Sequence, residues 1–193
     1  MHYNFIEIGT SDFNTIIEQD NPGIGLSIEP LQIYLDNLPD KEGVTKVNCA
    51  ISGIDGVTDV YWIDPEDIIK YNLPHWLRGC NSIMNPHPTA VIELKNRNLI
   101  SIYKQAKCET ISWDTLIKRY DIESVDHLKI DTEGHDCIIL QSILKSDILP
   151  KTIFFENNSL ANPKLTESTL KKLMDVGYEI INKTPDDIHV KLK

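Results

Sequence analysis

Carboxylates stand at the ends of four short apolar runs in this sequence. Each run has the length and composition of a buried strand, and the acid comes where that strand would end. In an open parallel α/β sheet, ligands bind just beyond the carboxyl ends of the strands. Burying a carboxylate there costs free energy unless it binds a partner. The pattern therefore predicts a binding site built from strand ends, with Glu7, Glu29, Asp131 and Glu156 as its acids.

The first two acids, Glu7 and Glu29, indicate a cofactor that carries a ribose. They lie 22 residues apart, and an acid about 20 residues after the first turn is the usual acceptor of ribose hydroxyls in nucleotide-binding α/β folds. A dinucleotide fold also needs G-x-G-x-x-G there, but only Gly9 is present, residues 10–15 contain no glycine, and the chain has no Walker A motif. A ribose cofactor without a pyrophosphate fits better, and the positively charged sulfonium of S-adenosylmethionine suits an acidic pocket. The other interpretation of Glu7 is an ordinary helix-capping or solvent-facing carboxylate.

Oxygen ligands after the two later strands favour a divalent cation. Asp131 ends one strand, and Glu156 and Asn157 end the next. Three hard oxygen ligands with room for water suit Mg²⁺, Mn²⁺ or Ca²⁺, and a hydroxyl acceptor needs a base or a metal ion to lose its proton. We therefore expect Asp131, Glu156 and Asn157 to hold a cation such as Mg²⁺ or Mn²⁺. The alternative is that Glu156 and Asn157 bond to loop backbone or contact substrate without metal.

Two neighbours of Asp131 join it as catalytic candidates. His135 lies four residues further on, at the predicted start of a helix, and a neutral imidazole can accept a proton near pH 7. The alternative for His135 is a helix N-terminal histidine exposed to water. Three roles are open to Glu133: orienting Lys129, holding the substrate or capping the helix.

We expect the middle of the chain to form a pocket for a second substrate, the acceptor molecule. Aromatic rings pack against the C–H faces of sugars, and arginine donates hydrogen bonds in a fixed fork. The candidates are Trp62, His75, Trp76 and Arg78. The alternative is that both tryptophans belong to the core and that Arg78 pairs with a carboxylate.

The hydrophobic periodicity predicts a β-α-β-α-β unit, an irregular middle region and a second α/β half. Residues 53–112 have no clean period and are expected to form an irregular insert on the substrate side, in which 57–63 could be a strand and 65–71 a helix. The whole chain, 1–193, is expected to be one domain. The expected strands are 5–9, 25–30, 44–52, 125–130, 152–158, 178–182 and 188–192, the last two as a hairpin, and the expected helices are 13–17, 31–38, 113–120, 137–145 and 165–176.

Composition narrows the class of protein. The chain has 193 residues, of which 41% are hydrophobic, and a formal net charge of −10. An acidic chain is a poor partner for nucleic acid and for anionic membranes. Its 4 cysteines form no C-x-x-C pair, which indicates reduced thiols in a cytoplasmic protein. We expect no signal peptide and no membrane span, because no apolar stretch approaches about 18 residues.

Five motifs in this order give the chain a family resemblance: FIEIGTSDFNT, GLSIEP, VNCAIS, LKIDTEGHD and FFENN. Together they resemble the FkbM family of class I S-adenosylmethionine-dependent methyltransferases. The resemblance implies a doubly wound, mostly parallel seven-stranded Rossmann-like sheet with a C-terminal antiparallel hairpin. Family members commonly carry a second glycine late in the first loop, where this chain has Phe13-Asn14. The resemblance implies that Glu7, Gly9, Thr10 and Ser11 line the methionine side of the cofactor, that Glu29, with Pro30 after it, holds the ribose, and that Ala50, Ile51 and Ser52 flank the adenine.

The activity implied by the resemblance is methyl transfer to a hydroxyl of a small acceptor, such as a sugar within a glycan. Two other interpretations remain open. One is O-methylation of a non-sugar small molecule, such as a phenol. The other is a non-catalytic module that binds S-adenosylmethionine.

Overall fold

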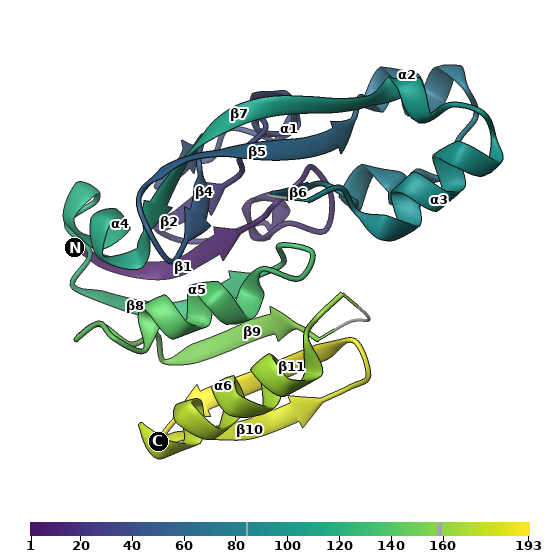
Figure 1. The fold of residues 1–193 in the computed structure, drawn as a ribbon. Coiled ribbons are helices and arrows are strands. Elements are labelled where there is room, and N and C mark those ends of the chain that lie inside the picture. Colours follow the sequence, from purple (N-terminus) through teal and green to yellow (C-terminus); the bar gives the residue numbers. More distant parts are fainter. Residues whose placement is uncertain (84, 158–159) are drawn as a thin grey trace.

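The computed structural model describes residues 1–83, 85–157 and 160–193. Within these residues the chain forms a seven-stranded sheet with the order β10-β11-β9-β8-β1-β2-β3 (Figure 1). The pairs β1–β2, β2–β3, β1–β8 and β8–β9 are parallel, whereas β11 runs antiparallel to both β9 and β10. This confirms the expected fold class. The strands are β1 (His2–Ile8), β2 (Gly25–Ile28), β3 (Val44–Val47), β8 (Ser124–Ile130), β9 (Thr152–Glu156), β10 (Tyr178–Lys183) and β11 (Asp187–Leu192).

The order of strands along the sheet reverses at β1. Strands β2 and β3 lie on one side of it, and β8 and β9 lie on the other. Ile8 at the end of β1 is aligned with Ile130 at the end of β8, so Gly9 and Asp131 leave the sheet side by side. A crevice for ligands is expected at such a reversal, just outside the carboxyl ends of the two strands.

Helices cover the sheet and bury its apolar side chains. Helices α4 (Trp113–Arg119), α5 (Asp136–Ile143) and α6 (Pro163–Asp175) contact one another in that order, and α6 lies across the C-terminal strands (Figure 1). Trp113, Ile139 and Leu173 from these helices are fully buried against sheet residues such as Leu128 and Phe155. The short helix α1 (Gln32–Asn37) connects β2 to β3.

The middle of the chain is more regular than expected, and the possible strand over 57–63 and helix over 65–71 are both present as β5 and α2. It contains a second, four-stranded sheet with the order β4-β7-β5-β6. Residues 104–107 of β7 are all exposed to solvent, so this part of the strand lacks the apolar alternation by which a strand is recognised. The elements of this region are β4 (Ala50–Ser52), β5 (Gly56–Ile63), α2 (Pro65–Lys70), β6 (Ser82–Ile83), α3 (Pro88–Asn96) and β7 (Tyr103–Ser112).

Three predicted elements have different limits. The strand expected over 44–52 divides into β3 and β4, because the Asn48 amide donates to the carbonyls of Glu29 at 3.1 Å and Pro30 at 3.0 Å as the chain leaves the first sheet. The helix expected over 13–17 is only a 3-10 turn, Ile16–Glu18, which follows two residues with positive φ, Ser11 and Asn14. Strand β9 ends at Glu156, and Asn158, which was expected to continue it, lies outside the described residues.

Two expectations about the environment of the chain concern cysteines and membranes. All four cysteines are buried free thiols. Among the helices of the described ranges, none is both long and apolar enough to cross a membrane.

Candidate active site

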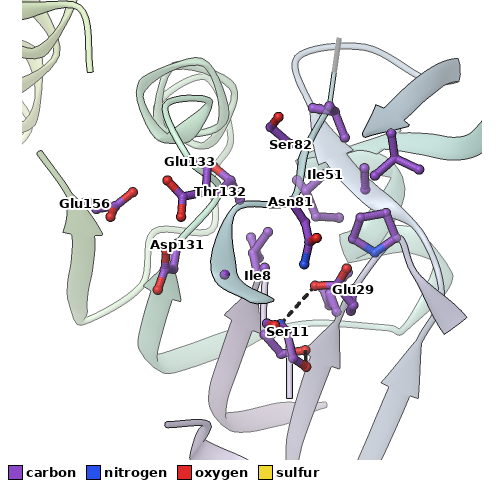
Figure 2. A pocket seen from close by; sticks show the side chains of 18 of the residues that line it. Ile8, Ser11, Glu29, Ile51, Asn81, Ser82, Asp131, Thr132, Glu133 and Glu156 are labelled. Carbon is purple, nitrogen blue, oxygen red and sulfur yellow. Dashed lines mark hydrogen bonds between the residues drawn. The ribbon is translucent and has the colours of Figure 1, made fainter. Parts of the chain in front are cut away.

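A cavity of about 290 Å³ opens at the carboxyl ends of β1, β2 and β8. We call it the first cavity. Figure 2 shows Asp131, Glu133 and Glu156 on one side of it and Ser11 and Glu29 on the other. Its lining includes Gly9, Thr10, Ser11, Glu29, Pro30, Ala50, Ile51, Trp76, Asp131, Glu133 and Glu156. The structure thus gathers most of the predicted site residues around one space.

Glu29 is fixed at one end of the first cavity. It is 3% exposed, and its two carboxylate oxygens accept the backbone N–H groups of Ser11 at 3.0 Å and Leu31 at 3.1 Å. Burial raises the pKa of Glu29 to about 7, against the lowering effect of these two hydrogen bonds. A carboxylate held in this way has lone pairs left for hydroxyl donors in the cavity.

Gly9 lets the first loop pass close to the end of β8. Its φ is +80°, and a Cβ at this position would lie 1.9 Å from the backbone oxygen of Asp131. Only glycine fits such a position, because a side chain would both clash and favour negative φ. The loop of residues 9–11 therefore lies directly against the cavity with its backbone accessible.

Glu7 takes a different position from the one expected of it. It is fully buried and is not among the residues that line the first cavity. Its carboxylate accepts Lys129 Nζ at 2.8 Å and the backbone N–H of Ile16 at 2.9 Å. Burial raises its pKa, and Lys129 opposes this rise. In the structure Glu7 supports the loop from behind.

An apolar slot lies beside Glu29. Ala50 and Ile51 line it, together with Ile8, Ile28 and Val60. Ser52, which was expected to continue this wall, is not a lining residue; its hydroxyl lies 3.1 Å from Nε2 of His135. A flat apolar slot next to a buried acid suits a heteroaromatic base attached to a ribose.

Three carboxylates converge at the other end of the first cavity. Asp131, Glu133 and Glu156 bring oxygen atoms within 4.8 Å of one another. Burial raises the pKa of Asp131 to about 7; Lys129 opposes this rise and Glu133 adds to it. Asn157 was expected in this group, but it does not line the cavity, and its backbone N–H donates to the carbonyl of Asp186 at 2.6 Å.

Asp136 organises this acidic end and was missed in the sequence. It is 2% exposed. One carboxylate oxygen accepts the Thr132 hydroxyl at 2.6 Å, and the other accepts the backbone N–H of Glu156 at 3.0 Å. It thereby connects the ends of β8 and β9. An acid in the first turn of a helix was the available signal, since such residues bond to backbone N–H groups.

His135 is buried and faces a neighbouring space. Besides its contact with Ser52, it lines a second cavity of about 340 Å³, and it is not among the lining residues of the first. Burial lowers the pKa of His135, so the ring is neutral at pH 7. The alternative of an exposed histidine is therefore wrong, and a role as base depends on what the second cavity binds.

The four residues expected in the acceptor pocket do not gather in one place. Trp76 lines the first cavity and is 45% exposed. Arg78 pairs with the buried carboxylate of Asp12, and its Nη1 lies 3.0 Å from His75 Nε2. It thereby links residues 53–112, which we call the insert, to the first loop. Trp62 lies on β5, where Lys104 stacks on its ring, and it lines neither of the two cavities. The structure therefore contains the alternative arrangement, in which Arg78 pairs with a carboxylate.

His87 is a second residue that the sequence did not reveal. Its Nδ1 accepts the backbone N–H of Ala90 at 3.3 Å as the cap of α3, and its Nε2 lies 3.3 Å from Glu133. Cys80, His87 and Glu133 lie within metal-ligating distance of one another. However, a neutral ring that accepts at Nδ1 carries its proton on Nε2, so His87 donates to Glu133 and does not offer a lone pair to a metal.

An open, mostly parallel α/β sheet with a cavity at its reversal point is the architecture of enzymes that bind nucleotide-like cofactors. The profile of the Methyltransferase FkbM domain matches residues 4–180, and the chain therefore belongs to the FkbM methyltransferase family.

One solved structure supports the fold. The crystal structure of methyltransferase FkbM from Methylobacillus flagellatus KT at 2.20 Å resolution matches with a TM-score of 0.51 and 12% sequence identity. The match covers 99% of this chain and 44% of that one, so this chain spans less than half the length of that protein. No curated protein sequence matched the chain.

Proposed function

We propose that this protein is an S-adenosylmethionine-dependent O-methyltransferase that methylates a hydroxyl group of a small acceptor, namely a sugar of a glycan, in the cytoplasm. The family supports the methyl transfer. The observation that carries the proposal is a single cavity with a fixed buried acid, Glu29, at one end and an acidic cluster at the other. The sugar as acceptor rests on the family resemblance and on Trp76 at the cavity wall.

The lining of the first cavity fits the methyl donor. Glu29 would accept the ribose hydroxyls, with Pro30 beside it, and Ala50 and Ile51 would pack on the adenine. The close approach at Gly9 leaves the backbone of Thr10 and Ser11 for the methionine group. No lysine or arginine is among the described residues that line this cavity, which disfavours pyrophosphate cofactors and favours a sulfonium cation. The bound donor would supply a methyl carbon already activated by its positively charged sulfur.

The acidic end would hold the acceptor and remove its proton. A carboxyl group with a pKa near 7 is well matched to proton transfer at neutral pH, and Asp131 has a pKa of about 7. Glu133 would orient the hydroxyl, because its carboxylate is fixed by His87. His135 is the alternative base, since it is neutral and lines the adjoining space. Alignment of the hydroxyl with the methyl carbon would supply much of the acceleration, roughly 7–11 kcal/mol in well-oriented reactions.

A divalent cation is a separate part of the proposal. Asp131 and Glu156, with Glu133 or Asn157 as a third ligand, offer the hard oxygen atoms that Mg²⁺ and Mn²⁺ prefer. Calorimetry with MgCl₂ and MnCl₂ on the protein and on Glu156→Gln tests this directly. Binding that the variant loses would support the site. An absence of binding to either protein, with full turnover in EDTA, would rule it out.

The proposed function is tested first through the product cofactor. Calorimetry with S-adenosylhomocysteine should give binding to the wild-type protein, and Glu29→Ala should weaken it at least about 30-fold, since two hydrogen bonds to a charged group are lost. Release of S-adenosylhomocysteine from S-adenosylmethionine is then measured with methyl glycosides and with phenols. Turnover with glycosides supports the proposal, turnover with phenols alone replaces the sugar by an aromatic acceptor, and binding without turnover on any acceptor favours a non-catalytic module.

A further inference from the structure

A second cavity adjoins the first and shares a wall with it. It has a volume of about 340 Å³, within the usual range for small-molecule sites. Ser82, Ile83, Thr132 and Glu133 line both cavities. The two cavities therefore adjoin at the acidic end of the first, where Glu133 borders both.

The lining of the second cavity combines apolar and polar residues. Ile83, Pro86, Pro88, Ile138 and Leu160 supply the apolar contacts. Thr132, Glu133, His87 and His135 supply the polar ones. Such a lining suits a compound that carries both an apolar group and hydroxyl groups.

Histidines aside, the charged residues in the described lining of the two cavities are all acidic. Glu29, Asp131, Glu133 and Glu156 line the first, and Glu133 lines both. Among the residues described, no lysine or arginine lines either cavity. In the metal-free protein, an anionic ligand in the second cavity would meet the Glu133 carboxylate, with the other acids beyond it and no lysine or arginine to compensate. Like charges at short distance in a partly buried site repel strongly.

Glu133 is held at the junction by a neighbour from the insert. His87 accepts the Ala90 N–H at Nδ1, so its Nε2–H points to the carboxylate of Glu133. Glu133 itself has φ +54°, a conformation that is uncommon for residues other than glycine. The surrounding contacts hold this carboxylate toward the shared wall, where a ligand hydroxyl would find an acceptor.

We propose that the second cavity binds the methyl acceptor, and that in the metal-free protein it prefers an uncharged or cationic hydroxyl compound with an apolar group. Phosphorylated sugars, nucleotide sugars and uronic acids are disfavoured there. The inference rests on the proposed function for the identity of the reaction, but the binding site and its charge preference are tested without turnover and with EDTA present.

Two probes of equal shape test the charge preference. Phenyl β-D-glucopyranoside and phenyl β-D-glucuronide differ in one carboxylate, and saturation-transfer NMR with added S-adenosylhomocysteine measures the binding of each. We expect the glucoside to bind at least tenfold more tightly than the glucuronide. Glu133→Gln should reduce this preference at least threefold. Equal binding of the two probes, or no binding of the glucoside, would overturn the proposal.

A pair of tryptophan variants tests the location. Ile138 lines the second cavity, whereas Ile92 is an exposed isoleucine on α3 that lines neither cavity. Ile138→Trp should weaken glucoside binding at least fivefold, and Ile92→Trp should leave it unchanged. Equal binding to both variants would place the probe elsewhere and refute the proposal.

Binding of S-adenosylhomocysteine to each protein separates the two claims. If it binds to the wild-type protein and to Ile138→Trp, the first cavity is intact and a failure of the glucoside counts against the second cavity alone. If it binds to none of them, the proposed function fails, and the glucoside measurements still decide the acceptor site.

Discussion

Lys129 and Glu7 face each other across β8 and β1, with Nζ 2.8 Å from Oε1, and they join two strands at the point where the sheet reverses its order. Glu7 is fully buried, and Lys129 also donates to the carbonyl of Asn14 at 3.0 Å. The pair therefore fixes the loop that borders the first cavity. Removing one partner of a buried ion pair leaves an uncompensated charge, which costs far more than losing the pair itself.

Lys129→Met is expected to lower the free energy of unfolding by about 3 kcal/mol, because it leaves the buried Glu7 carboxylate without its cation. Urea denaturation measures this loss. The double variant Glu7→Gln/Lys129→Met should be destabilised by about 1–2 kcal/mol less than the sum of the single variants. Lys107→Met is the matched control, since Lys107 pairs with Asp59 at 2.7 Å on an exposed face, and it should change stability by less than about 0.5 kcal/mol. Additive single effects at positions 7 and 129 would contradict the coupling.

The Gly9 turn makes a second prediction. Gly9→Ala should destabilise the protein by more than about 2 kcal/mol, because its Cβ would overlap the backbone of Asp131 at positive φ. Binding of S-adenosylhomocysteine should weaken more than about tenfold in the protein that remains folded. In the control Gly56→Ala, the nearest atom to the new Cβ is Thr110 Oγ1 at 3.6 Å, and both properties should stay near wild type. A stable, tightly binding Gly9→Ala would show that the loop can move away from β8.

The first sheet could be predicted from the sequence because its strands obey simple rules. Leu128 and Ile130 alternate with Lys129 just before Asp131, and residues 152–156 form a mainly apolar run that ends in Glu156. Of the second sheet, β5 could be recognised, but β7 could not, because residues 104–107 of β7 are exposed and the strand pairs with β5 as a ribbon. Its stability comes from long-range pairing, which leaves little trace in local periodicity.

The position of a candidate residue was predictable where it depends on a single strand end, as with Glu29 and Asp131, which both line the first cavity. The role of a side chain was not predictable where that side chain binds a partner that is distant in the sequence. Glu7 is bound by Lys129, and His87 caps α3 while it contacts Glu133. These relations depend on register between strands and on the position of the insert, and no spacing within the sequence encodes them.

Glu29 makes the unliganded protein less stable as pH rises. Its pKa is about 7 in the folded chain and 4.5 as the ordinary value, so between these values the folded state binds more protons than the unfolded state. The free energy of unfolding should therefore fall between pH 4.5 and pH 7, by about 3 kcal/mol from this residue.

Urea denaturation at pH 5 and pH 8 measures the fall attributed to Glu29. It should be clearly smaller in Glu29→Gln, which does not titrate, and unchanged in Asp36→Asn, which alters an exposed residue of α1. An equal fall in Glu29→Gln and the wild type would assign the pH dependence to other groups.

The contact between Arg78 and Asp12 is expected to control cofactor affinity, because it fastens the insert over the first cavity. The Asp12 side chain is 1% exposed, and the Arg78 carbonyl accepts the Ser11 hydroxyl at 3.2 Å. Arg78→Met leaves the Asp12 charge buried without its cation, so residues 9–15 should lose order and the Ser11 contact to Glu29 should weaken. Calorimetry should then give affinity for S-adenosylhomocysteine lowered about tenfold, with faster proteolysis in this loop. Arg97→Met breaks an exposed helical pair with Glu93 at 2.6 Å and should leave both unchanged. Wild-type affinity in Arg78→Met would show that the loop keeps its shape without the insert.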